Sequence, residues 1–97
     1  MLNIALYGLN GHQIHGRFLK KPDARVRLAA VAGFTPPVVD ELRAAGLTAF
    51  EVLPGLDALL ARPAIDMVVL CSPRRDAQAA ECQRCLEAGK HVYAEKP

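Results

Sequence analysis

The residues from Gly8 to Gln13 are the first whose types and spacing suggest chemistry. They are Gly-Leu-Asn-Gly-His-Gln, directly after a short apolar segment. Glycines in such a turn let backbone N–H groups approach a pyrophosphate at a helix N-terminus. The full Gly-x-Gly-x-x-Gly pattern needs glycine at positions 8, 10 and 13, and only the first is present. The turn predicts a dinucleotide site, and an ordinary structural turn is the alternative. The candidate contacts are Gly8, Leu9, Asn10, Gly11, His12 and Gln13, of which His12 would meet a phosphate.

A second candidate position is the end of the next apolar segment, Val26–Ala32. In dinucleotide-binding folds this place carries an acid that bonds the adenine-side ribose. Here it is Gly33, followed by Phe34, and the next acid is Asp40. Without a carboxylate at this position, we predict little discrimination between NAD and NADP. Phe34 would flank the adenine or serve as a core aromatic, and both interpretations stay open.

Cys82 and Cys85 have the spacing of a redox or zinc pair. They fall in the middle of a predicted helix, whereas a redox pair sits at a helix start, where the thiolate is stabilised. A zinc site needs about four ligands, and a second pair is missing. We therefore interpret them as small buried hydrophobic residues and expect no metal. The odd total of three cysteines favours a reducing, cytoplasmic compartment.

The composition limits the classes of partner. The chain has 97 residues, of which 52% are apolar and 23% charged, as expected for one small globular domain. A net charge of +2 without a run of basic residues argues against a nucleic-acid partner. No apolar run reaches the roughly 18 residues of a membrane span, so we expect no membrane partner.

Strands alternating with helices would position these candidates. Apolar segments predict strands at Leu2–Tyr7, Val26–Ala32, Thr48–Phe50, Ile65–Cys71 and His91–Ala94. Caps, prolines and glycines predict helices over Gln13–Lys20, Pro36–Gly46, Leu56–Arg62 and from Ser72-Pro73 to about Ala88. This β-α-β-α-β-α-β-α-β order predicts an α/β fold with a doubly wound, mainly parallel sheet. The ligand site then lies where the carboxyl ends of the strands meet, near residues 8–13, 33–35, 71–74 and 95–96.

Two longer stretches carry a resemblance to a known family. Residues 65–73 are Ile-Asp-Met-Val-Val-Leu-Cys-Ser-Pro, and residues 86–97 are Leu-Glu-Ala-Gly-Lys-His-Val-Tyr-Ala-Glu-Lys-Pro. Together they resemble the N-terminal domain of the Gfo/Idh/MocA (glucose–fructose oxidoreductase / inositol dehydrogenase) family, over essentially the whole chain. The resemblance implies a Rossmann-type domain that binds NAD or NADP, followed by a second domain with the substrate pocket. We expect that domain beyond Pro97, and a homo-oligomer for the complete protein.

The resemblance also implies roles for residues that follow the last two strands. Lys96 would lie beside the nicotinamide and the substrate carbon as the catalytic acid/base, with Glu95 near the nicotinamide ribose. Arg74 and Gln78 stand where the family commonly has Asn and His. The implied cofactor contacts in this part of the chain are Cys71, Ser72, Pro73, Arg74, Gln78, Glu95 and Lys96.

The implied activity is hydride transfer between NAD(P) and a hydroxyl or carbonyl carbon of a sugar- or polyol-like small molecule. The 97 residues alone are expected to be inactive, because the substrate domain is missing. The alternative is a non-catalytic nucleotide-sensing or partner-binding domain with degraded cofactor contacts. The incomplete glycine pattern and Gly33 favour that alternative, whereas Glu95-Lys96-Pro97 favours the enzyme. A small reductase of amino-acid biosynthesis shares the first βαβ unit but gives no reason for Glu-Lys-Pro.

Overall fold

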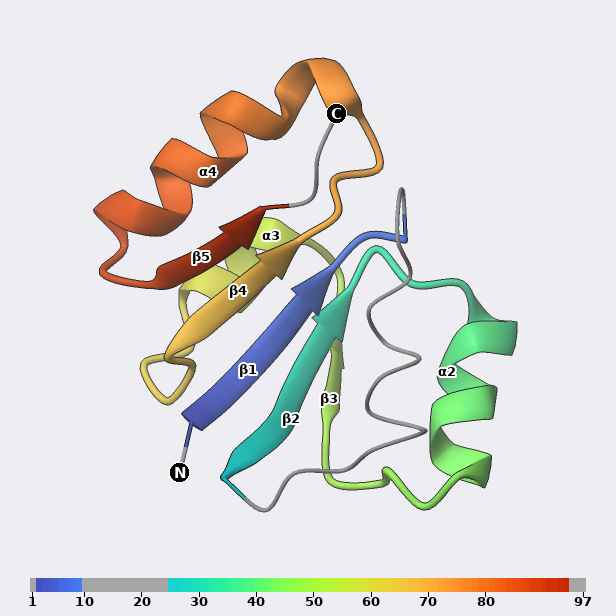
Figure 1. The fold of residues 1–97 in the computed structure, drawn as a ribbon. Coiled ribbons are helices and arrows are strands. Elements are labelled where there is room, and N and C mark those ends of the chain that lie inside the picture. The colour runs from blue at the N-terminus through green and yellow to red at the C-terminus, as the bar shows by residue number, and fades with distance from the viewer. Residues whose placement is uncertain (1, 10–24, 95–97) are drawn as a thin grey trace.

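A single five-stranded sheet forms the centre of the protein (Figure 1). The computed structural model describes residues 2–9 and 25–94, so the helix predicted at Gln13–Lys20 lies outside the described residues. The strands are β1 (Leu2–Tyr7), β2 (Val26–Ala32), β3 (Glu51–Leu53), β4 (Met67–Leu70) and β5 (His91–Ala94). Their order is β3-β2-β1-β4-β5, and every neighbouring pair is parallel. The order reverses beside β1, which confirms the doubly wound α/β fold.

The central strands are continuous apolar runs, because helices cover both faces of a parallel sheet. Ile4–Leu6 of β1 and Val68–Leu70 of β4 are buried without interruption. The strands predicted at Leu2–Tyr7, Val26–Ala32 and His91–Ala94 are confirmed with the same ends.

Helices lie on both faces of the sheet (Figure 1). On one face is α2 (Pro36–Ala44), and on the other are α3 (Leu56–Leu60) and α4 (Gln78–Glu87), the latter preceded by a 3₁₀ turn, η1 (Arg75–Ala77). The predicted start of α2 is confirmed, with Thr35 as N-cap and proline in the first turn. The Thr35 carbonyl accepts the N–H groups of Val38 and Val39, both at 3.1 Å.

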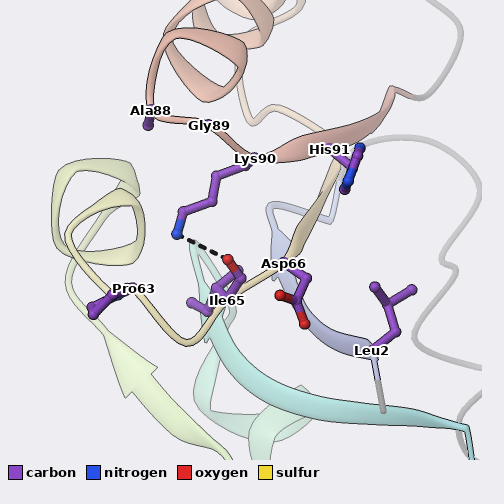
Figure 2. Close-up of a pocket in the computed structure, with 8 residues that line it drawn as sticks. All are labelled: Leu2, Pro63, Ile65, Asp66, Ala88, Gly89, Lys90 and His91. Carbon is purple, nitrogen blue, oxygen red and sulfur yellow. Dashed lines mark hydrogen bonds between the residues drawn. The ribbon is translucent and has the colours of Figure 1, made fainter.

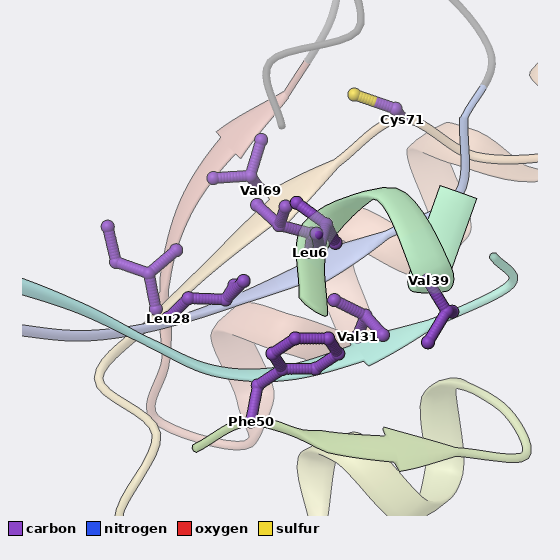
Figure 3. Close-up of a cluster of buried hydrophobic side chains, with 9 residues drawn as sticks. Leu6, Leu28, Val31, Val39, Phe50, Val69 and Cys71 are labelled. Carbon is purple, nitrogen blue, oxygen red and sulfur yellow. The ribbon is translucent and has the colours of Figure 1, made fainter. Parts of the chain in front are cut away.

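Two hydrophobic cores hold these layers together. The core between the sheet and α2 contains Leu6, Leu28, Val31, Val39, Leu42, Phe50, Val69 and Cys71 (Figure 3). The core on the other face joins small residues of β1 and β2 to α3 and α4, including Ala5, Ala30, Leu56, Leu59 and Cys85. Alanines at the centre of the sheet bring these helices close to it.

The predicted third strand is wrong in position. The sequence placed it at Thr48–Phe50, whereas β3 is Glu51–Leu53. Phe50 is apolar because it fills the core beneath α2, not because it belongs to a strand. The strand itself is defined by pairing with Ala30–Ala32 of β2, and its first two residues are exposed at the sheet edge.

The predicted start of the last helix is also wrong. Ser72-Pro73 has the form of a cap followed by proline, but α4 begins only at Gln78. The Ser72 hydroxyl closes a tight turn with Arg74 instead of capping a helix. Smaller differences are that α3 ends at Leu60 instead of Arg62, and that β4 is shorter than the predicted Ile65–Cys71.

Candidate functional site

The exits of β1, β2 and β4 meet at the carboxyl edge of the sheet. The Gly8 N–H donates to the Ala32 carbonyl of β2 at 2.9 Å. The Cys71 N–H donates to the Tyr7 carbonyl at 2.8 Å, which extends the pairing of β1 with β4 by one residue. The first turn of the sequence therefore leaves the sheet between two neighbouring exits, at the place where ligands bind in doubly wound folds.

Position 8 requires glycine because the backbone at the β1 exit lies very close to the backbone at the β4 exit. Gly8 has φ +83, and a Cβ there would lie 2.0 Å from the Cys71 carbonyl oxygen. The same Cβ would lie 2.9 Å from Cδ of Pro73. Gly33 has φ +72, and its Cβ position is 3.3 Å from the Gly8 nitrogen. The structure thus brings Gly8, Gly33 and the Cys71–Pro73 exit together, and glycines let them approach this closely.

The β4 exit is held by hydrogen bonds within the protein. Ser72 is fully buried, and its hydroxyl accepts the Arg74 N–H at 3.1 Å and donates to the Arg74 carbonyl at 2.7 Å. The Ser72 N–H donates to Oε1 of Gln78 at 3.2 Å. The exposed guanidinium of Arg74 contacts the Asp76 carboxylate at 3.0 Å. Three predicted cofactor contacts thus belong to one local network around Ser72.

The remaining predicted contacts lie around this edge or outside the described residues. Leu9 is half-buried directly after Gly8. Phe34 packs against the α2 core, and it also lines a groove of about 290 Å³ with Val39, Arg43 and Val52. Outside the described residues are Asn10, Gly11, His12, Gln13, Glu95 and Lys96.

A contact between Tyr7 and Glu81 was not foreseen from the sequence. Tyr7 is the last residue of β1, and Glu81 lies in the first turn of α4. Burial raises the pKa of the Tyr7 phenol, and the charge and hydrogen bonding of Glu81 raise it further. Oε1 of Glu81 is buried with no hydrogen-bond partner within the described part of the chain. Only the packing of α4 on the sheet brings these residues together, so sequence spacing carries no signal for them.

The cysteine pair of α4 differs in burial. Cys85 is fully buried in the second core, as predicted, and its pKa is raised by burial first and then by neighbouring Cys82. Cys82 is only half-buried. Within residues 2–9 and 25–94, no three His, Cys, Asp or Glu side chains come together as metal ligands.

A groove of about 650 Å³ lies at the opposite, amino edge of the sheet (Figure 2). Its polar groups hold nearby turns: Nζ of Lys90 donates to the Arg62 and Ile65 carbonyls at 2.7 and 2.9 Å. Oδ2 of Asp66 accepts the Asn3 N–H at 2.8 Å. Because ligands of doubly wound sheets bind at the carboxyl ends, this groove is not the candidate dinucleotide site.

Comparison with known proteins defines the class to which this fold and edge belong. Residues 2–97 match the profile described as "Oxidoreductase family, NAD-binding Rossmann fold". The chain belongs to the Gfo/Idh/MocA oxidoreductase family and corresponds to its NAD-binding Rossmann domain. Comparison with curated proteins gives no match.

Solved structures of dehydrogenases and a ketoreductase share the fold. A protein from Sinorhizobium meliloti 1021 assigned as a myo-inositol dehydrogenase is 32% identical, with TM-score 0.77, over 100% of this chain and 28% of that chain. The scyllo-inositol dehydrogenase of Lactobacillus casei is 27% identical, with TM-score 0.78, over 100% of this chain and 29% of that chain. A 3-ketoreductase from Actinomadura kijaniata, in complex with NADP and TDP-benzene, is 28% identical, with TM-score 0.72, over 99% of this chain and 29% of that chain. The chain spans less than a third of the length of these relatives.

No helix in the described ranges is both long and apolar enough to cross a membrane.

Proposed function

We propose that the protein binds the dinucleotide of an NAD(P)-dependent oxidoreductase whose substrate is a sugar- or polyol-like small molecule. The observation that carries the proposal is the junction of Gly8, Gly33 and the β4 exit at the carboxyl edge of the sheet. The family match and the inositol dehydrogenases among the similar structures support the substrate class.

The chain's own contribution is to bind and orient the dinucleotide. Backbone at the β1 exit would face the pyrophosphate, and the β2 and β4 exits would flank the two riboses. Nicotinamide supplies the chemistry, which is transfer of a hydride to or from a carbon that carries oxygen. Gly33 carries no carboxylate to bond a ribose hydroxyl or to repel a 2′-phosphate, so both NAD and NADP are accepted.

Lys96 is proposed as the catalytic residue, on the resemblance of Glu95-Lys96-Pro97 to the family motif. Its ammonium would hold or move a proton at the substrate oxygen. Where the chain is joined to a substrate domain, Lys96→Met is expected to lower kcat on the order of 10²-fold, the usual span of acid–base catalysis. Dinucleotide affinity should change far less. A variant with near-normal kcat and lost cofactor binding would make Lys96 a binding residue instead.

A second candidate function is non-catalytic nucleotide sensing. Gly33 in place of an acid and the incomplete glycine pattern favour it. The Lys96→Met measurement separates the two functions, because a sensor has no turnover to lose.

Titration of the 97-residue chain with NADH and NADPH, followed by nicotinamide fluorescence at one salt concentration, tests the binding function. Both should bind, with affinities that differ by less than about tenfold, which corresponds to roughly 1.4 kcal/mol. We also expect no polyol oxidation by this chain alone. Failure of both dinucleotides to bind at millimolar concentration would refute the proposal, and a strong preference for NAD would show that another group recognises the ribose.

A further inference from the structure

We propose that Gln78 is a positioning residue, which sets the dinucleotide-binding edge by fixing the peptide group between Cys71 and Ser72. This inference rests on the proposed function, because its effect is measured through dinucleotide binding. Gln78 was expected from the family resemblance to touch the cofactor. In the structure its side-chain oxygen accepts the N–H of Ser72 at 3.2 Å.

The two ends of that peptide group have different partners. Its N–H belongs to Ser72 and donates to Gln78. Its carbonyl oxygen belongs to Cys71 and occupies the space that a Cβ at Gly8 would need, 2.0 Å from that position. Since a peptide group is planar and rigid, the direction of its N–H also determines the direction of its carbonyl. The Gln78 side chain therefore controls how the Cys71 oxygen faces the β1 exit.

The peptide is anchored on its other flanks as well. The Cys71 N–H is held by the Tyr7 carbonyl at 2.8 Å, and the Ser72 hydroxyl closes the turn to Arg74. Ser72 is fully buried, so its N–H has little access to water if the Gln78 acceptor is removed. A buried donor without an acceptor is costly, and the peptide would then tilt toward a new partner.

The position of Gln78 is fixed because its helix, α4, packs on the sheet. Cys85, two turns along the helix, is fully buried in the second core. Glu81, three residues after Gln78, meets Tyr7 at the end of β1. Successive turns of α4 thus contact the ends of β1 and β4, two of the three strands whose exits meet at the candidate site.

The test compares Gln78→Met, which keeps the length of the side chain but removes the acceptor, with Gln78→Glu, which keeps an oxygen for the Ser72 N–H. Gln83→Met is the matched control, because Gln83 is exposed on the same helix. For each variant of the 97-residue chain we would measure the Kd for NADH, the Tm, and the amide resonances of Gly8 and Ser72 without ligand.

Gln78→Met should raise the Kd for NADH on the order of tenfold and shift the Gly8 amide resonance before any ligand is added. Gln78→Glu should restore most of the affinity and the Gly8 resonance, while Gln83→Met should match the native chain. A native Kd for Gln78→Met would overturn the inference. So would equal weakening by Met and Glu with an unchanged Gly8 resonance, since that pattern means direct contact with the cofactor. If the native chain itself binds no NADH, the proposed function fails instead.

Discussion

At the carboxyl edge of the sheet neighbouring strand exits meet through their backbones, whereas at the amino edge polar side chains link neighbouring segments. Gly8 and Gly33 let the exits of β1, β2 and β4 approach within contact distance. At the other edge, the Lys90 ammonium bonds to the Ile65 carbonyl (Figure 2) and to the Arg62 carbonyl, and the Asp66 carboxylate accepts the Asn3 N–H of β1. At the amino edge, Lys90 and Asp66 thus bond within the protein beside a groove of about 650 Å³. The Ser72 and Gln78 side chains also hold the β4 exit, but the strand exits meet one another through backbone at Gly8 and Gly33. Backbone is therefore available at this junction to face a ligand.

Replacement of Gly8 should have the largest effect. Gly8→Ala combines a positive φ with a collision against the Cys71 carbonyl, so we expect a loss of about 3 kcal/mol in the free energy of unfolding. Gly46→Ala is the control, because Gly46 also has a positive φ (+98) but nothing within 4 Å of its Cβ position. Its loss should be about 1 kcal/mol. Urea denaturation measures both, and equal losses would show that the Gly8–Cys71 approach is unimportant.

Removal of the Lys90 ammonium should destabilise the protein without changing its affinity for the dinucleotide. Lys90→Met leaves the Arg62 and Ile65 carbonyls without their donor, at a cost of about 2 kcal/mol in the free energy of unfolding. The Kd for NADH should stay within about twofold of the native value, because distant sites act independently. Urea denaturation measures the free energy of unfolding, and fluorescence titration of the same sample measures the Kd for NADH. Weakened NADH binding in fully folded protein would contradict the separation of the two edges.

The smallest effect is expected at Tyr7, between the sheet and α4. Tyr7→Phe removes the phenol hydroxyl whose pKa Glu81 raises, and should cost at most about 1 kcal/mol at pH 7. The pKa of Tyr7 is raised above its unfolded value of 10.0, so the folded state favours the neutral phenol. Its contribution is fully present below pH 10.0 and is lost as the pH rises from there through the folded pKa.

Stability curves from pH 7 to 11 measure this contribution. The native chain should lose more stability above pH 10 than Tyr7→Phe does. Tyr93→Phe is the control, because Tyr93 is 52% exposed, and it should behave as the native chain does. Parallel curves for the native chain and Tyr7→Phe would show that the phenol does not contribute.

The sequence predicts elements well where a buried apolar run ends at a glycine. This holds for β1 at Gly8 and for β2 at Gly33, because a buried strand and a positive φ each leave a local signal. It fails at β3, an exposed edge strand defined by pairing with β2. It fails again at Ser72-Pro73, where a hydroxyl that could cap a helix closes a turn instead.

The sequence predicts that the candidate site lies at the carboxyl edge of the sheet, but it does not predict the side-chain contacts that hold this edge. Topology alone places Gly8, Gly33 and Cys71 at the carboxyl ends of neighbouring strands. The bond from Ser72 to Gln78 and the contact of Tyr7 with Glu81 depend on how α4 sits on the sheet. Such contacts join residues without a characteristic spacing, so they emerge only from tertiary packing.

The contact between Gly8 and Cys71 also bears on when the site can form during folding. Its two sides are far apart in the sequence, because the segment between them carries β2, β3 and the connecting helices. Contacts that close such long loops carry a large entropic cost, so they tend to form late. On the proposed function, a nascent or partly opened chain would then lack the binding edge, and dinucleotide would bind only the completed fold. The ligand would thereby protect the whole domain from unfolding, by about 2.7 kcal/mol at a concentration of 100 times its Kd.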